Sequence, residues 1–284
     1  MPIIAPSGTL GSHFSDLPKR LASAALMICL ALWTLFEGDW IFDIFWCVCG
    51  VLIHWEWQRM VSQEGVKHRV LIGTLSLSVA ALLVRFHLVD LSLLSLISGA
   101  GVLAALAPRG QRLWQGSGVL YAGALIIAVF VLRHSILDGF ESIVWLFALV
   151  WGTDVMAYIG GRIIGGPKLW PRVSPSKTWS GFITGITSGA ILGVVVLLLL
   201  SSSTLSITSV FLLGLCTCAV AQGGDLFESS LKRHFGIKDS SHLIPGHGGF
   251  MDRLDGFLTA AVFAALVGSL IAGVAAAAHG IVAW

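Results

Sequence analysis

Residues 182–200, FITGITSGAILGVVVLLLL, form an apolar run without a single charged side chain. A helix needs about 20 such residues to cross the hydrocarbon core of a membrane. Comparable runs occur along the whole chain, at 21–36, 40–57, 70–88, 91–107, 118–133, 141–161, 206–228 and 256–281. The sequence therefore predicts an all-α, polytopic helical membrane protein with about nine transmembrane helices.

The composition agrees with this prediction. Hydrophobic residues make up 56% of the 284 residues, charged residues make up 11%, and the mean hydropathy is +0.89. Soluble domains average about 45–50% apolar and about 25% charged residues. The net charge of +2 is small and confined to the polar segments, which argues against a nucleic-acid-binding surface.

The distribution of basic residues predicts the orientation, because Lys and Arg accumulate in cytoplasmic loops. With nine spans and a cytoplasmic N-terminus, only Arg85 and Arg133 of the 17 basic residues fall in outer segments. An even number of spans would break this asymmetry. We therefore expect a cytoplasmic N-terminus and a periplasmic C-terminus.

One segment contrasts sharply with the apolar runs. Residues 229–255 read SSLKRHFGIKDSSHLIPGHGGFMDRLD and combine cations, carboxylates, histidines and glycines. Ionisable residues next to membrane spans persist mainly where they face a polar cavity, a partner or an ion. A functional site is therefore expected here, on the predicted cytoplasmic side together with the polar loop 162–179.

Carboxylates flank this segment on both sides. Asp225 and Glu228 are three residues apart, as are Asp252 and Asp255, so each pair shares one helix face. Their convergence would be repulsive without a cation, and hard oxygen ligands of this kind suit Mg²⁺. The alternative is a surface network in which these acids pair with nearby basic residues, Lys232, Arg233, Lys238 and Arg253.

The run Pro245–Gly249 is rich in glycine and permits close approach of its backbone to a ligand. The N–H groups of such a turn, including those of Gly248 and Gly249, can bind phosphate oxygens. His247 either contacts a phosphate or caps the turn, and the spacing does not decide between these roles.

The upstream loop offers a second set of phosphate ligands. Hydroxyl groups and an ammonium group directly precede the run 182–200, at a helix N-terminus suited to anions: Ser174, Ser176, Lys177 and Thr178. A Walker A motif is absent from the sequence. Within the apolar runs, Asp154 is a further candidate for a polar cavity, whereas Glu56 either joins a site or merely extends towards the membrane surface.

Such a collection of metal ligands and cations is suited to phosphoryl or nucleotidyl transfer, which depends on positioning and charge neutralisation. The acceptor is expected to be a lipid phosphate, because membrane spans frame the site. An ion-coupled transporter is the alternative from another class, with Asp154, Asp225 and Glu228 as a midplane ion path. Concentration of charge at one membrane face disfavours that alternative.

The motifs themselves resemble those of a known family. Ser229-x-Leu231-Lys232-Arg233, Lys238-Asp239 and Ile244-Pro245-x-His247-Gly248-Gly249-Phe250-x-Asp252-Arg253-Leu254-Asp255 resemble the signature of phosphatidate cytidylyltransferases, or CDP-diacylglycerol synthases. Thr153-Asp154 and Ser174-Pro175-Ser176-Lys177-Thr178-Trp179 resemble upstream blocks of that family. Ser180 departs from the family pattern, which commonly has Glu at this position.

The resemblance implies that CTP and phosphatidic acid react to CDP-diacylglycerol and pyrophosphate. It implies a Mg²⁺-dependent homodimer in the bacterial inner membrane, with or without a second cation, and with a cavity that faces the cytoplasm. It assigns metal binding to Asp225 and Asp252, and charge neutralisation to Lys232, Arg233 and Lys238. Asp239, His247 and Asp255 would shape the same site, to which Arg253 of the signature also belongs.

The implied organisation has three parts: a cytoplasmic tail at 1–20, N-terminal transmembrane helices at 21–140, and a C-terminal transmembrane catalytic region at 141–284. A CTP-dependent lipid kinase, which would attack the γ-phosphorus and release CDP, remains the alternative among enzymes.

Overall fold

The computed structural model describes residues 17–62, 65–201, 206–246 and 248–282. Within them, nine long helices follow one another along the chain: α2 (Leu17–Glu37), α3 (Asp39–Val61), α4 (Val66–Arg85), α5 (Val89–Leu106), α6 (Arg112–Arg133), α7 (Gly139–Ile163), α8 (Trp179–Leu200), α9 (Ile207–His234) and α10 (Met251–Ala272). Eight of these, α3 to α10, are long and apolar enough to cross a membrane, and the apolar part of α2, Leu21–Glu37, is shorter. The predicted polytopic, all-α membrane fold is confirmed.

Two helices extend further into the polar segment than expected. α9 continues past the predicted end at 228 to His234, and its last turn carries Lys232, Arg233 and His234. Cations are favourable there because the carboxyl end of a helix carries partial negative charge. α10 begins at Met251, before the predicted start at 256, so Asp252 lies in its first turn.

The last predicted span, 256–281, is too long. α10 ends at Ala272 because Gly273 adopts a φ of 80°, a left-handed conformation that glycine tolerates and a continuous helix excludes. The chain continues through the 3₁₀ helix η1 (Val274–Ala276) and the short helix α11 (His279–Val282).

A small β-hairpin, not predicted from the sequence, connects α7 to α8. Strand β1 (Lys168–Trp170) pairs antiparallel with β2 (Ser174–Thr178), with Lys168 opposite Thr178 and Trp170 opposite Ser174. β1 has only three residues and β2 is polar, so neither shows the hydrophobic alternation that identifies a strand in a sequence.

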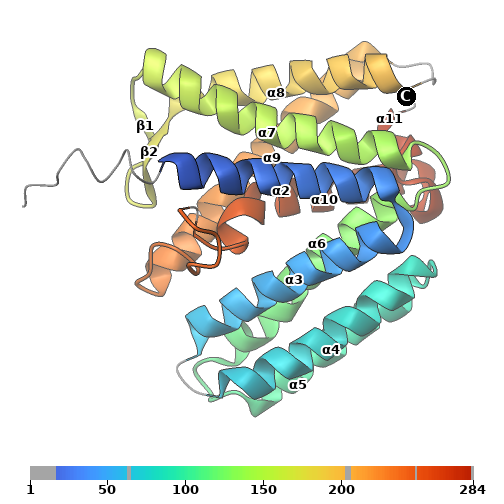
Figure 1. Cartoon of the computed structure of the whole chain (residues 1–284), viewed down its shortest axis with the longest axis vertical. Helices are drawn as coiled ribbons and strands as arrows, with labels where there is room; N and C mark the ends of the chain where they lie inside the picture. Colours follow the sequence, from blue (N-terminus) through green and yellow to red (C-terminus); the bar gives the residue numbers. More distant parts are fainter. Residues whose placement is uncertain (1–16, 63–64, 202–205, 247, 283–284) are drawn as a thin grey trace, which may run out of the picture.

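Alternation of helix direction brings the polar segments together. α7 packs against α8 along one edge of the molecule, and α4 packs against α5 along the other (Figure 1). The β-hairpin, the end of α9 and the beginning of α10 lie at one end of the bundle, together with the ends of α3 and α5 (Figure 1). The two polar segments of the sequence therefore share one end, as their predicted placement on one side of the membrane requires.

Stacked aromatic rings hold α10 against both halves of the chain. Trp46 of α3 stacks on Phe257 of α10 with 4.9 Å between ring centroids, and Phe147 of α7 lies 5.3 Å from Phe257. Phe147 also stacks on Trp151 at 4.6 Å. Trp46, Phe147 and Phe257 are almost completely buried. This packing contributes apolar burial and fixes α10, whose first turn carries Asp252.

Candidate active site

A cavity of about 990 Å³ opens between α7, the β-hairpin, α9 and α10. Six acidic and five basic side chains line it: Asp154, Asp225, Glu228, Asp239, Asp252, Asp255, Arg162, Lys168, Lys177, Lys232 and Arg253. The acids suit a cation, and the bases suit a polyanion such as a nucleoside triphosphate. The mixture of both charges matches the expectation of a site for phosphate groups.

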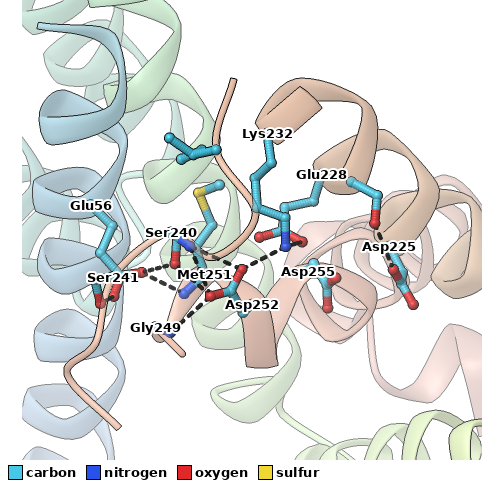
Figure 2. A network of polar contacts seen from close by, with 12 residues as sticks. Glu56, Asp225, Glu228, Lys232, Ser240, Ser241, Gly249, Met251, Asp252 and Asp255 are labelled. Carbon is cyan, nitrogen blue, oxygen red and sulfur yellow. Dashed lines mark hydrogen bonds and ion pairs between the residues drawn. The ribbon is translucent and has the colours of Figure 1, made fainter. Parts of the chain in front are cut away.

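Lys232 connects the two helices that carry the signature. Its Nζ lies 3.0 Å from Oε2 of Glu228, one turn earlier on α9, and 2.6 Å from Oδ1 of Asp252 on α10. Figure 2 shows the ammonium group between these two carboxylates. Only 11% of the Lys232 side chain is exposed, so the attraction is weakly screened by water.

Asp252 is also held by the loop that precedes α10. Its Oδ2 accepts hydrogen bonds from the backbone N–H of Ser240 at 3.0 Å, the hydroxyl of Ser240 at 2.9 Å and the N–H of Gly249 at 2.8 Å. The position of Asp252 is therefore determined by Lys232 of α9 and by Ser240 and Gly249 of the loop. The N–H of Gly249, expected to bind phosphate, is engaged by this carboxylate.

Gly249 itself lies where only a glycine fits. A Cβ atom at this position would collide with the hydroxyl of Ser240 and with Oε1 of Glu56. We expect Gly249→Ala to destabilise the protein by about 1–3 kcal/mol, as overpacking does, and to lower any activity of the site. Thermal unfolding of the purified protein measures this, with Gly101→Ala on α5 as control because a Cβ there meets no atom within 4 Å. Equal stability of the two variants would contradict the expectation.

Lys177 attaches the β-hairpin to α9. Its Nζ lies 2.5 Å from Oδ2 of Asp225 and 2.9 Å from Oε1 of Gln222. The amide of Gln222 donates in turn to Oδ1 of Asp154 at 3.3 Å. Three elements, β2, α9 and α7, are thus connected by one polar network at the cavity wall, and Asp154 lines the cavity as expected.

Two hydroxyl groups stabilise the beginning of α8. Thr178 is the N-cap of α8, and its Oγ1 accepts a hydrogen bond from the N–H of Gly181 at 3.1 Å. Ser180 hydrogen-bonds with Thr178 at 3.1 Å and donates to the carbonyl of Gly165. The serine therefore closes the turn between α7 and α8.

The predicted site residues divide into three groups. Those that line the cavity are Ser176, Lys177, Thr178, Asp225, Lys232, Asp239, Asp252, Arg253 and Asp255. Those that the structure does not place in the lining are Ser174, Arg233, Lys238, Gly248 and Gly249. Arg233 donates to the carbonyl of Ile237 at 3.2 Å, at the end of α9. His247 lies outside the residues that the structure describes.

Several residues that shape the site were not identified from the sequence as site residues. Gln222 carries no charge and Ser240 and Ser241 are common loop residues, so none of them gave a signal. Glu56 does give a signal, a charge within an apolar run, but the sequence does not determine its role. Its side chain is completely buried and contacts the loop before α10, so it does not extend towards the membrane surface.

Three carboxylates gather at the centre of the site. Oε1 of Glu228 is buried without a hydrogen-bond partner among the described residues, and Asp252 and Asp255 lie within electrostatic reach of Glu228. In the described part of the chain, no group of three or more His, Cys, Asp or Glu side chains is arranged to hold a metal ion.

Comparison with known proteins identifies the family. A family model described as the cytidylyltransferase family matches residues 18–271. The chain belongs to the cytidylyltransferase family. The resemblance noted in the motifs is thereby confirmed, and the match also covers the N-terminal helices, which carry none of the signature.

Individual cytidylyltransferases resemble the chain, some over most of its length and others over about half of it. A protein of Brucella abortus named phosphatidate cytidylyltransferase is 37% identical over 261 residues, which cover 91% of this chain and 95% of the relative. A protein of the same name from Haemophilus influenzae is 32% identical over 280 residues, with 87% and 96% covered. One from Staphylococcus haemolyticus is 42% identical over 140 residues, 49% of this chain.

Proposed function

We propose that this cytidylyltransferase transfers the cytidylyl group of CTP to phosphatidic acid, giving CDP-diacylglycerol and pyrophosphate. The proposal is supported by the cavity between α9, α10 and the β-hairpin, whose lining combines cations with carboxylates. The shared name of the relatives, phosphatidate cytidylyltransferase, supports the choice of both substrates.

In the proposed reaction, an oxygen of the phosphatidate phosphate attacks the α-phosphorus of CTP. The new P–O bond forms as the bond to the β-phosphate oxygen breaks, and pyrophosphate leaves with its electron pair. The lipid phosphate is already ionised near pH 7, so no carboxylate is needed as a base. Lys177 and Lys232 would neutralise the phosphates, because catalysis of this type depends on positioning and charge.

Magnesium, with or without a second cation, would neutralise the phosphates further and orient them when bound. Asp225 and Asp252 are its proposed ligands, and Oε1 of Glu228, which has no hydrogen-bond partner among the residues that the structure describes, supports a cation in their neighbourhood. In the structure, Lys177 pairs with Asp225 and Lys232 with Asp252. Each lysine is thereby placed beside a proposed ligand of the ion that accompanies the phosphates.

We place the protein in the bacterial inner membrane with this cavity open to the cytoplasm, and we propose a homodimer. The gathering of basic segments at one end of the bundle supports the orientation, because such segments stay on the cytoplasmic side (Figure 1). The bacterial relatives support the location, and the family resemblance supports the dimer. The molar mass of the detergent-solubilised protein tests the oligomeric state.

The product test uses CTP labelled either at the α-phosphorus or at the γ-phosphorus. Purified protein with phosphatidic acid and Mg²⁺ is expected to transfer the α-label to lipid and to release the γ-label as pyrophosphate. Transfer of the γ-label to lipid with release of CDP would establish a lipid kinase instead. Transfer of neither label, together with CTP-independent uptake of a solute into vesicles, would favour a transporter.

A further inference from the structure

Glu56 joins the N-terminal half of the chain to the catalytic loop. It lies on α3 with a completely buried side chain. Its carboxylate accepts hydrogen bonds from the hydroxyl of Ser241 at 2.6 Å, the N–H of Phe250 at 2.9 Å and the N–H of Met251 at 2.7 Å. The hydroxyl of Ser240 lies 3.2 Å from its Oε2. Four polar groups, two from the middle of the loop between α9 and α10 and two from the beginning of α10, thus converge on a single side chain (Figure 2).

The contacts of Glu56 fix the beginning of α10. The first N–H groups of a helix lack partners within the helix, and a negative charge is favourable beside them. Phe250, at the N-cap position of α10, provides no side-chain cap of its own. The carboxylate of Glu56, supplied by another helix, receives the N–H groups of Phe250 and Met251 and so determines where α10 starts.

The same contacts lead to the proposed metal ligand. The hydroxyl of Ser240 lies between Oε2 of Glu56 at 3.2 Å and Oδ2 of Asp252 at 2.9 Å. A hydroxyl group has one proton, so these two acceptors share a single donor. From Asp252 the path continues to Lys232 at 2.6 Å. A change at Glu56 therefore alters the surroundings of Asp252 and Lys232 without touching the cavity, whose lining does not include Glu56.

We propose that Glu56 is a positioning residue for cytidylyl transfer. It holds Ser240, Ser241 and the first turn of α10 so that Asp252 and Lys232 face the phosphates of CTP. This inference rests on the proposed function. It gives the N-terminal helices a part in the reaction, although the sequence signature lies entirely in the C-terminal region.

The first test compares Glu56→Gln with Glu56→Asp. The amide of Gln points donor hydrogens at groups that are themselves donors, whereas Asp keeps the charge and shortens the reach. We expect Glu56→Gln to lower kcat/KM for CTP roughly 10- to 100-fold, as expected for the loss of buried hydrogen bonds to a charged group. KM for CTP should rise, because Lys232 is displaced, and Glu56→Asp should recover part of the loss.

The matched control is Gln58→Leu on the same helix. Gln58 is also completely buried, but its amide donates to the carbonyl of Gln115 at 3.0 Å, away from the site. This variant should leave KM for CTP unchanged, whatever its effect on the yield of folded protein. All rates are divided by the amount of folded enzyme, which is taken from the amplitude of the thermal unfolding transition.

A double-mutant cycle that combines Glu56→Gln with Ser240→Ala tests whether Glu56 acts on Asp252 through the hydroxyl of Ser240. If Glu56 acts through Ser240, the loss in kcat/KM for the double variant is smaller than the product of the two single losses. Unchanged KM for CTP in Glu56→Gln overturns the proposal, as does a rise in KM that Gln58→Leu reproduces, or multiplicative losses in the cycle. Wild-type protein that transfers no label from CTP to lipid would instead refute the proposed function.

Discussion

Asp252→Asn is expected to abolish nearly all CTP-dependent product, with a loss of at least about 100-fold. The substitution keeps the size of the side chain but removes the charge that Lys232 neutralises at 2.6 Å. It also turns an amide towards Ser240 or Gly249, whose N–H groups need an acceptor. The measurement is the rate of CDP-lipid formation by purified protein at saturating CTP and Mg²⁺.

The matched control for this variant is Asp90→Asn. Asp90 also lies in the first turn of a helix, α5, but it is exposed and does not line the cavity. Its substitution should leave the rate within about twofold of wild type, since surface changes have small effects. Full activity of folded Asp252→Asn would show that the reaction does not require the carboxylate of Asp252.

Lys232→Met is expected to lose both activity and stability. Glu228 is only 1% exposed, and Lys232 is its ion-pair partner as well as that of Asp252. Removing the cation leaves buried negative charge uncompensated, which destabilises proteins by about 3–5 kcal/mol. Thermal unfolding and product formation are measured on the same preparation.

Two further variants show whether the losses in Lys232→Met come from its contacts in the site. Lys67→Met removes an exposed ammonium near the start of α4 and should change neither stability nor activity appreciably. Lys232→Met combined with Glu228→Gln should recover part of the stability, because one buried charge is removed, but it should not recover activity. Wild-type activity in Lys232→Met would show that Lys232 does not act on the phosphates.

The fold was largely predictable because each span depends on a local property, a continuous apolar run. The predicted elements differ from the structure in the polar segments, where no apolar run marks the beginning or end of an element. α9 continues through the polar residues Ser229 to His234, since these are compatible with a helix outside the hydrocarbon core. The β-hairpin has no hydrophobic pattern, so only the antiparallel pairing of Lys168 with Thr178 identifies it.

The site was predictable to the extent that its residues are charged and adjacent in sequence. Lys232, Asp252 and Asp255 belong to one segment, and the structure places all of them at the cavity. The pairing of Lys177 with Asp225 joins segments separated by a whole transmembrane helix, so it follows from helix packing alone. The contacts of Glu56 with the start of α10 depend on packing in the same way.

CTP is expected to bind in the cavity between α9, α10 and the β-hairpin. A photoreactive analogue of CTP, cross-linked to the purified protein in the presence of Mg²⁺ and mapped by mass spectrometry, tests it most directly. The account predicts labelled peptides from residues 157–182 and 222–255, with labelling suppressed by excess CTP. CTP-protected labelling confined to α4, α5 or the opposite end of the bundle would contradict it.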